Sequence, residues 1–265
     1  MFSLEERVAV VTGGGGVLGS AMARGLSVAG ARVVVAGRSR GPLDACVDSL
    51  EGAGMAVTAD VLDRARLEAL RDSVLNEYGR IDILVNAAGG NVAAATLPPG
   101  GDVFDLPEDA MRQVVDLNLL GTVLPTQVLG AELAAGGSGS IVNITSMAAE
   151  RAITRVVGYS AAKAAVENYT RWMATELARR FGSALRVNAI SPGFFLADQN
   201  RALLTNEDGS LTDRGQRIID LTPAGRFGEP EELIGTLVWL CGDGARFVTG
   251  AVVPVDGGFS AFSGV

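Results

Sequence analysis

Residues 8–19 read Val8-Ala9-Val10-Val11-Thr12-Gly13-Gly14-Gly15-Gly16-Val17-Leu18-Gly19, and the helix-length stretch Gly19–Ala29 follows. Glycines allow the backbone to approach a pyrophosphate closely, and a helix N-terminus adds N–H groups and the positive end of a dipole. A simple strand-to-helix turn is the alternative, but it needs fewer glycines, each of which costs conformational entropy. The stretch therefore predicts a strand, a dinucleotide-binding loop and a helix.

Further apolar, β-branched runs recur along the chain. They lack alternation of polar and apolar residues, which is typical of strands buried on both faces of a parallel sheet. The predicted strands are Val8–Val11, Arg32–Ala36, Met55–Ala59, Ile81–Val85, Ser140–Ile144, Leu185–Ile190 and Ala251–Val255. The predicted helices between them are Gly19–Ala29, Arg64–Tyr78, Ala110–Ala134, Tyr159–Phe181 and Glu229–Cys241. We expect an α/β fold: a single doubly wound, Rossmann-type domain over residues 1–265, with a seven-stranded parallel sheet and helices on both faces.

The chain of 265 residues contains no histidine and only two cysteines. This excludes a Ser-His-Asp triad, a Cys-His pair and a histidine-bound zinc within the chain. Cys46 and Cys241 have neither metal-ligand spacing nor the pattern of a disulfide framework. We therefore expect no metal site and a reducing, cytoplasmic setting.

The formal net charge is −8, from 22 basic and 30 acidic residues. This argues against nucleic acid or an anionic membrane as the main partner. The segment Met1–Glu6 has acids where a signal peptide has basic residues. No apolar run is expected to approach the roughly 18 residues of a membrane span, because Pro125, Gln127 and Glu132 interrupt the longest candidate. The expected ligands are small molecules.

The end of the second predicted strand bears on the choice of cofactor. Many NAD-binding folds place an acid there to hold the ribose 2′-hydroxyl. This chain reads Val35-Ala36-Gly37-Arg38-Ser39-Arg40, with two arginines and no acid. A guanidinium suits a 2′-phosphate, although both arginines could instead be solvated. We expect NADP(H) to be preferred, with NAD(H) possible.

Two long irregular stretches each follow a predicted strand, one near residues 90–107 and the other near 194–221. Ligands in this architecture bind beyond the carboxyl ends of parallel strands. Loops of this length are usually functional or disordered. We expect both to contact substrate.

A tyrosine and a lysine stand at i, i+4 on a predicted helix. Tyr159 and Lys163 share one helical face, and Ser146 follows the strand Ser140–Ile144. A nearby ammonium stabilises a phenolate and lowers the pKa of a tyrosine from about 10. Tyr159 then suits a general acid or base, and Ser146 a hydrogen bond to the reacting oxygen. Such a pair alone is weak evidence, because most are structural.

In combination with other motifs, this pair resembles the short-chain dehydrogenase/reductase family over essentially the whole chain. The motifs are Thr12-Gly13 to Gly19, Asp60-Val61, Asn86-Ala87-Ala88-Gly89, Asn118, Ser146, Tyr159 with Lys163, Pro192-Gly193 and Val255-Asp256-Gly257-Gly258. The resemblance implies an enzyme that transfers a hydride between a nicotinamide cofactor and a substrate carbon.

The resemblance also implies residue roles. Tyr159 would move the proton, Lys163 would hold the nicotinamide ribose and lower the pKa of Tyr159, and Ser146 would position the substrate oxygen. Asn118 would sustain a water-linked proton relay. The residues expected to bind cofactor are Gly13, Gly15, Gly16, Val17, Leu18, Gly19, Arg38, Asp60, Val61, Asn86, Ala87, Gly89, Tyr159, Lys163, Pro192 and Gly193.

Several segments are similar to one subgroup of the family, the D-mannonate oxidoreductases or fructuronate reductases. They are 13–18, 87–91, 124–127, 192–195, 199–204, 206–212 and 257–260. The subgroup implies D-fructuronate and D-mannonate as substrates. The chain departs from the subgroup at Val92-Ala93, where His-Pro is usual. It departs from the family at Val17 and Ala197, where glycine and threonine are usual.

A hexonate carries a carboxylate and several hydroxyls, so its pocket should offer a cation and a few amides. Arg151 lies between Ser146 and Tyr159 in the sequence, and an arginine can bind a carboxylate through two parallel hydrogen bonds. We expect Arg151 to bind the carboxylate and Asn91 a hydroxyl, with Ser146 and Tyr159 at the reacting group. Arg201 is a further candidate, whose alternative role is a solvated helix cap.

Two other functions stay open. One is the same chemistry on another carbonyl: a ketogluconate, a polyol or a 3-oxoacyl thioester, the last of which would need a basic surface for its acidic carrier. The other is a catalytically silent dinucleotide-binding regulator. Such a regulator should have lost a member of the set Asn118, Ser146, Tyr159 and Lys163, and all four are present.

The predicted helix Val157–Phe181 is long and apolar enough to pack against a second copy. Closed homo-oligomers are common among soluble proteins, and the family resemblance implies tetramers or dimers formed through this helix. The expected partners are a small-molecule substrate and other copies of the chain.

Overall fold

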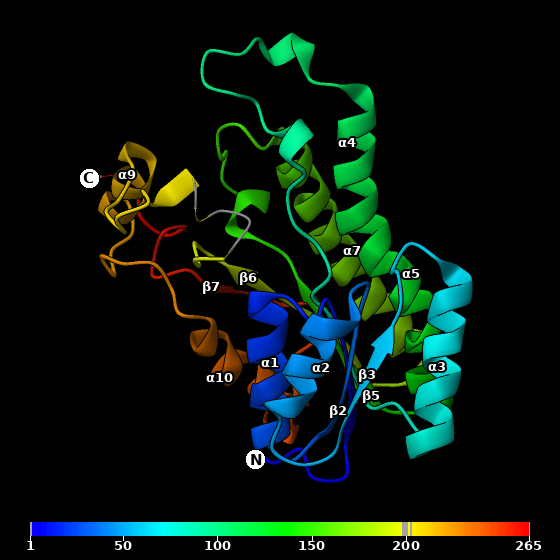
Figure 1. The fold of residues 1–265 in the computed structure, drawn as a ribbon. Helices are drawn as coiled ribbons and strands as arrows, with labels where there is room; N and C mark the ends of the chain where they lie inside the picture. Colours follow the sequence, from blue (N-terminus) through cyan, green and yellow to red (C-terminus); the bar gives the residue numbers. More distant parts are fainter. Residues whose placement is uncertain (1, 198–200, 202, 265) are drawn as a thin grey trace.

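The computed structural model describes residues 2–197, 201 and 203–264. The strands form a single, all-parallel, seven-stranded sheet in the order β3-β2-β1-β4-β5-β6-β7 (Figure 1). Their bounds are β1 (Val8–Thr12), β2 (Arg32–Gly37), β3 (Gly54–Thr58), β4 (Ile83–Asn86), β5 (Gly139–Ile144), β6 (Leu185–Pro192) and β7 (Val252–Val255). Every predicted strand is confirmed. The chain reverses its direction of progress across the sheet between β1 and β4, which is where such folds bind ligands.

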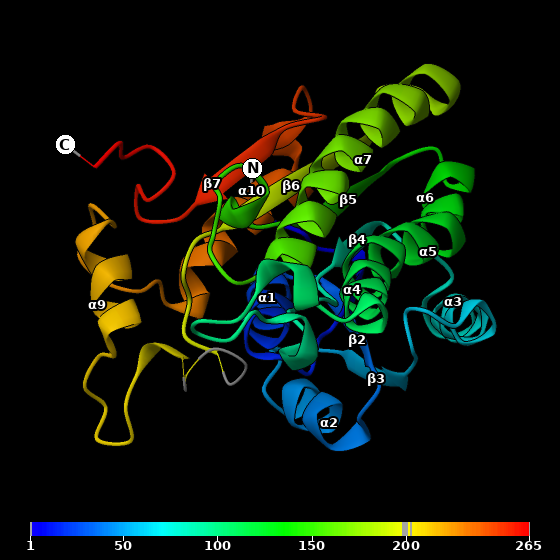
Figure 2. The ribbon, with the colours of Figure 1, turned by 90° about the horizontal axis from the view of Figure 1, so that it is seen from above.

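Helices cover both faces of the sheet, as Figure 2 shows from above. Their bounds are α1 (Val17–Val28), α2 (Arg40–Asp48), α3 (Arg64–Tyr78), α4 (Glu108–Val115), α5 (Gly121–Val128), α6 (Gly130–Ala135), α7 (Val157–Phe181), α9 (Asp213–Asp220) and α10 (Ile234–Cys241). The predicted α/β fold with a doubly wound sheet is therefore confirmed.

The two faces of the sheet bury two separate apolar cores. Along β1, Ala9 and Val11 join a core with α1, α2 and α10. Val8 and Val10 point to the other face and join a core with α3, α6 and α7. Because alternate side chains of one strand enter opposite cores, both must be apolar. This accounts for the continuous apolar runs of the sequence.

Some helices differ from the prediction. The expected continuous helix Ala110–Ala134 is divided into α4, a π-helical turn over Asp116–Leu120, α5 and α6. Helices α2 and α9 were not expected, and α9 lies within the predicted loop near 194–221. Of that loop, residues 198–200 and 202 lie outside the described residues.

The helical stretch Glu108–Ala135 also bears on the expectation about membranes. It spans 28 residues and contains an 18-residue window with a mean hydropathy of 1.3, which is long and apolar enough to cross a membrane by length and composition. The expectation that no apolar run approaches a membrane span is wrong on this measure, since the interrupting polar residues do not lower the mean enough. Half of that window is buried inside the fold.

Candidate active site

A cleft of about 1020 Å³ lies at the carboxyl edge of the sheet. Helix α9 and the segment before α4 rise above this edge in Figure 1. The cleft is lined by the glycine loop, by the ends of the central strands, and by residues from both long loops. The predicted site residues among those lining it are Gly13, Gly15, Gly16, Val17, Leu18, Gly19, Arg38, Asp60, Val61, Ala87, Gly89, Asn91, Ser146, Tyr159, Lys163, Pro192 and Gly193.

The glycine loop packs tightly against the end of β4. Gly13 has a φ of +69°, and a Cβ there would lie 2.8 Å from the carbonyl oxygen of Ala87. The hydroxyl of Thr12 accepts hydrogen bonds from the backbone N–H groups of Ala87 and Ala88, both at 3.2 Å. Only glycine fits this conformation and spacing without strain. The loop and the end of β4 together form one wall of the cleft.

Helix α1 begins at Val17, with Gly16 as its N-cap and no side chain capping it. A Cβ on Gly19 would overlap the carbonyl of Gly13, so this turn has room for backbone only. Its uncapped N–H groups and the helix dipole suit a pyrophosphate. The arrangement fits a dinucleotide, with Gly16 as the residue before the helix and Val17 as its first residue.

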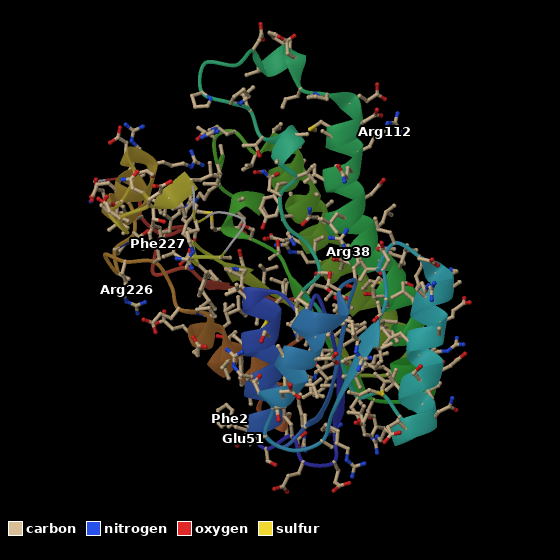
Figure 3. All side chains as sticks on the ribbon, in the orientation of Figure 1. Phe2, Arg38, Glu51, Arg112, Arg226 and Phe227 are labelled. Atoms are coloured by element: carbon tan, nitrogen blue, oxygen red, sulfur yellow. The ribbon has the colours of Figure 1, made fainter. Side chains whose placement is uncertain are left out.

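Arg38 and Arg40 differ in their surroundings. Arg40 Nε donates to both carboxylate oxygens of Asp44, at 2.8 and 2.9 Å. Arg38, labelled in Figure 3, lines the cleft at the end of β2. Within the described part of the chain it has no hydrogen bond or ion pair. Arg38 is therefore the arginine free to meet a ligand.

Asn86 lies behind the cleft and does not line it. Its side chain is buried, and Nδ2 donates to Thr126 Oγ1 at 3.0 Å and to Asn143 Oδ1 at 2.8 Å. These bonds tie the end of β4 to α5 and β5. Asn86 thereby supports the end of β4 beneath the cleft, and its contact with a cofactor stays a prediction.

Asn118 sits in the π-helical turn and is fully buried. Its Nδ2 donates to the carbonyls of Gly90 and Val114, both at 2.8 Å, and its Oδ1 accepts from the Gly90 N–H at 3.0 Å. Its side chain is not among those that line the cleft, and its part in a proton relay stays a prediction. Asn118 fixes the loop at Gly89, where a Cβ would lie 2.8 Å from Asn118 Oδ1 and 3.1 Å from Lys163 Nζ.

Ser146, Tyr159 and Lys163 come together at the centre of the cleft. The Ser146 hydroxyl lies close enough to the Tyr159 hydroxyl to lower its pKa. Lys163 Nζ lies 5.7 Å from the centre of the Tyr159 ring and donates to the Ile144 carbonyl at 2.7 Å. The end of β5 and the first turns of α7 thereby place a hydroxyl, a phenol and an amine on one ligand-accessible wall.

The pKa values of the pair are set by burial. Burial raises the pKa of Tyr159 above 10.0, against a smaller opposing effect of the Ser146 hydrogen bond. Burial also lowers the pKa of Lys163 from 10.5 to about 8. The expected net lowering of the tyrosine pKa is therefore wrong for this structure, because the effect of burial is larger than those that oppose it. Tyr159 keeps its proton at neutral pH, which suits a proton donor to a carbonyl oxygen.

The predicted substrate residues are only partly brought to the cleft. Asn91 lines it, and its Oδ1 is buried with no partner among the described residues. Arg151 is exposed, lies outside the cleft, and donates instead to the Ser260 carbonyl. Arg201 is likewise exposed and outside the cleft lining. The expectation that Arg151 faces the site failed because its side chain turns toward the C-terminal segment.

Two other arginines line the cleft, and the sequence analysis missed both. They are Arg155, just before α7, and Arg214, in the first turn of α9. Arg151 and Arg155 both lie between Ser146 and Tyr159, so position in the sequence gave no reason to prefer Arg155. Nothing in the sequence connected Arg214 to the site, because α9 was not expected.

Among residues 2–197, 201 and 203–264, no group of three or more histidines, cysteines, aspartates or glutamates could hold a metal ion.

Comparison with known proteins extends over nearly the whole chain. A family model described as Enoyl-(Acyl carrier protein) reductase matches residues 16–260. The uncharacterized oxidoreductase UxuB of Bacillus subtilis is 46% identical over 99% of this chain and 98% of its own length. A 2-dehydro-3-deoxy-D-gluconate 5-dehydrogenase of Escherichia coli is 35% identical over 98% of both chains.

Solved structures agree in fold. A protein of Haemophilus influenza, provisionally described as a D-mannonate oxidoreductase and solved with bound NAD, superposes with a TM-score of 0.92 at 38% identity. The match covers 99% of this chain and 98% of that one. The sequence relatives, these structures and the cleft agree: the chain belongs to the short-chain dehydrogenase/reductase family and is an NAD(P)-dependent oxidoreductase acting on CH–OH groups.

Proposed function

We propose that the protein interconverts the ketone and secondary alcohol of a sugar acid, with D-fructuronate and D-mannonate as the substrate pair and NADP(H) as the preferred cofactor. The observation that carries the proposal is the charge of the cleft. Its described lining includes Arg38, Arg155, Lys163 and Arg214 but only one acid, Asp60. In a chain with a net charge of −8, this concentration of positive charge favours anionic ligands.

The chain's own residues would act as follows. The cofactor, when bound, supplies or accepts the hydride. The Tyr159 hydroxyl donates its proton to the carbonyl oxygen during reduction, and its phenolate takes the proton back during oxidation. Ser146, which lines the cleft beside Tyr159, holds the same substrate oxygen. Lys163 in its charged form stabilises the phenolate, and Asn118 holds the neighbouring loop at Gly90.

The relatives support a polyhydroxylated acid. The dehydro-deoxy-gluconate dehydrogenase and the provisional D-mannonate oxidoreductase are both described as acting on sugar acids. Other relatives act on steroids and polyols, as the names 7alpha-hydroxysteroid dehydrogenase and D-threitol dehydrogenase state. The family therefore does not itself specify the substrate, and the charge of the cleft favours the acid.

The first test is a panel of carbonyl substrates: D-fructuronate, D-tagaturonate, 5-keto-D-gluconate and an acetoacetyl thioester, each with NADPH and with NADH. We expect kcat/KM, followed by NADPH absorbance, to be highest for D-fructuronate. Highest activity on another sugar acid would support the substrate class but not D-fructuronate as the substrate. Val92 and Ala93 would then be the first residues to test as determinants of specificity. Turnover of the thioester alone would contradict the proposal and support a reductase of acyl carriers. Cofactor binding without any turnover would support a silent regulator.

Arg38 provides the test of cofactor preference. Structures of relatives contain NAD in one case and NADP in another, so the preference must come from this chain's own residues. Since Arg38 is unpaired and a hydrogen bond to a charged group contributes about 1.5–3 kcal/mol, Arg38→Ala should lower kcat/KM with NADPH about 10- to 100-fold. Its kcat/KM with NADH should change little.

Arg40→Ala is the matched control, because Arg40 is already paired with Asp44. Steady-state kinetics with both cofactors give the result. Equal losses with NADPH and NADH in Arg38→Ala would mean that Arg38 does not read the 2′-phosphate.

We also propose that the protein is a cytoplasmic homo-oligomer, a dimer or a tetramer. Cys46 and Cys241 are buried free thiols, in keeping with a reducing compartment. Helix α7 exposes Val157, Trp172 and Phe181, and large exposed apolar groups on one helix suit contact with a second copy. Sedimentation of the purified protein would give the number of subunits.

A further inference from the structure

Two hydrogen bonds to backbone groups of the first long loop hold Arg155 in the wall of the cleft. Its Nε donates to the Leu97 carbonyl at 2.7 Å, and its own carbonyl accepts from the Leu97 N–H at 2.9 Å. Its φ is +79°, a region that residues other than glycine rarely adopt. The contacts with Leu97 stabilise this conformation. They fix the direction of the side chain and leave both terminal nitrogens of its guanidinium without a partner in the described structure.

Arg214 reaches the same place from a distant part of the chain. Thr212 caps α9 by accepting from the Gly215 N–H at 3.1 Å. A Cβ on Gly215 would overlap the Leu204 carbonyl, so this glycine lets α9 approach the preceding segment. Arg214 then donates from Nη1 to Thr154 Oγ1 at 3.1 Å and from Nη2 to the Thr154 carbonyl at 3.3 Å. The two arginines thus meet at residues 154 and 155.

The two guanidiniums lie close together without a balancing acid. The charge of Arg155 lowers the pKa of Arg214, in addition to the lowering caused by burial. No ion pair within the described residues includes either arginine, although most other arginines of the chain have one. Two like charges held together by hydrogen bonds to neutral groups form a site that an anion would stabilise.

We propose that Arg155 and Arg214 together bind the carboxylate of the substrate and orient its ketone toward Ser146 and Tyr159. This assignment rests on the proposed function. Arg155 is placed four residues before Tyr159 on the same side of the cleft, so a carboxylate held there lies at the substrate end and not at the Arg38 end. Asn91, in the first long loop, also lines the cleft, and its buried Oδ1 has no partner among the described residues.

The test compares a sugar acid with its neutral analogue. D-Fructose carries a hydroxymethyl group where D-fructuronate carries a carboxylate. Loss of hydrogen bonds to a charged group corresponds to a rise of about 10- to 100-fold in KM for D-fructuronate in Arg214→Met and in Arg155→Met. The kcat/KM for D-fructose should stay within about threefold of wild type, since hydrogen bonds to a neutral group contribute less.

Arg217→Met is the matched control, because Arg217 is exposed on the same helix and does not line the cleft. Arg155→Lys and Arg214→Lys, which keep the charge, serve if a methionine variant does not fold. These lysine variants should retain part of the preference for D-fructuronate over D-fructose. Equal losses for D-fructuronate and D-fructose, or no loss for either, would overturn the assignment while leaving the proposed function standing.

A second readout separates failure of the assignment from failure of the proposed function. Tartrate, a small hydroxydicarboxylate, can be titrated calorimetrically into the protein with NADP⁺. If wild type reduces no sugar acid, the proposed function fails. The tartrate titration then still tests whether Arg155 and Arg214 form an anion-binding site. Binding that is lost in Arg214→Met and kept in Arg217→Met supports an anion site. Equal binding by both variants, or no binding to wild type, overturns it.

Discussion

Replacing Tyr159 with phenylalanine should lower kcat for carbonyl reduction by about 10²- to 10⁴-fold, the range expected for loss of a general acid. The substitution removes only the Tyr159 hydroxyl, and Tyr159 lines the cleft beside Ser146. Because burial raises the pKa of Tyr159, its hydroxyl keeps its proton at neutral pH, and the variant has no phenol to donate it. The melting temperature and the affinity for NADPH, measured by fluorescence titration, should stay close to those of wild type.

Tyr169→Phe is the matched control for this result. Tyr169 lies on the same helix, and burial raises its pKa to about 12. It does not line the cleft. We expect its variant to retain kcat. A Tyr159→Phe enzyme with near wild-type turnover would contradict the assignment of Tyr159 as the proton donor.

Replacing Lys163 with methionine should also lower kcat by about 10²-fold or more, because the charge that stabilises the phenolate is lost. The same substitution should change the free energy of unfolding only slightly. The substitution removes a hydrogen bond to the Ile144 carbonyl, which costs about 1–3 kcal/mol. It also removes the cost of burying an ammonium. A large loss of activity with a small change in melting temperature is the expected pattern.

The same lysine predicts a pH dependence of stability. Its pKa is lowered from 10.5 to about 8 in the folded state, so between these values the unfolded chain binds more protons. The free energy of unfolding of wild type, relative to Lys163→Met, should therefore rise as the pH increases from about 8 to about 10.5, by up to about 3 kcal/mol. Urea unfolding at pH 7.5 and pH 9.5 compares the two proteins.

Lys163 is the only lysine of the chain. Protein labelled with [¹³C]lysine thus gives side-chain NMR signals from this residue alone. Titration of that signal measures its pKa directly. A midpoint near the ordinary value of 10.5 would contradict both the buried position and the predicted pH dependence.

Much of the fold was predictable because strands and faces are set by local pattern. The run Val8–Val11 is apolar on both sides, which only a doubly covered strand requires. The break within 108–135 was not predictable. Its π-helical turn exists because Asn118 binds the carbonyl of Val114 and both backbone groups of Gly90, and Gly90 belongs to a separate strand-end loop. A hydrogen bond to a residue in a distant loop produces no periodic pattern in the sequence, so it could not be predicted.

Contacts between distant loops also explain which predictions of site residues were right and which were wrong. The contact among Ser146, Tyr159 and Lys163 was predictable from the sequence. These residues lie at the end of one strand and the start of the next long helix, which are consecutive along the chain. Arg151 and Arg155 could not be told apart by position, since both lie between Ser146 and Tyr159. The left-handed backbone at Arg155 and its contacts with the first loop determine which guanidinium enters the cleft.

The most direct test of the central claim follows the hydride into the product. D-Fructuronate is incubated with the protein and NADPH deuterated at the transferable position, and the product is identified by NMR and mass spectrometry. The account predicts D-mannonate with deuterium on the carbon that carried the ketone, and no such product with Tyr159→Phe. Failure of the wild-type protein to form any deuterated hexonate would contradict the claim that it is a sugar-acid oxidoreductase.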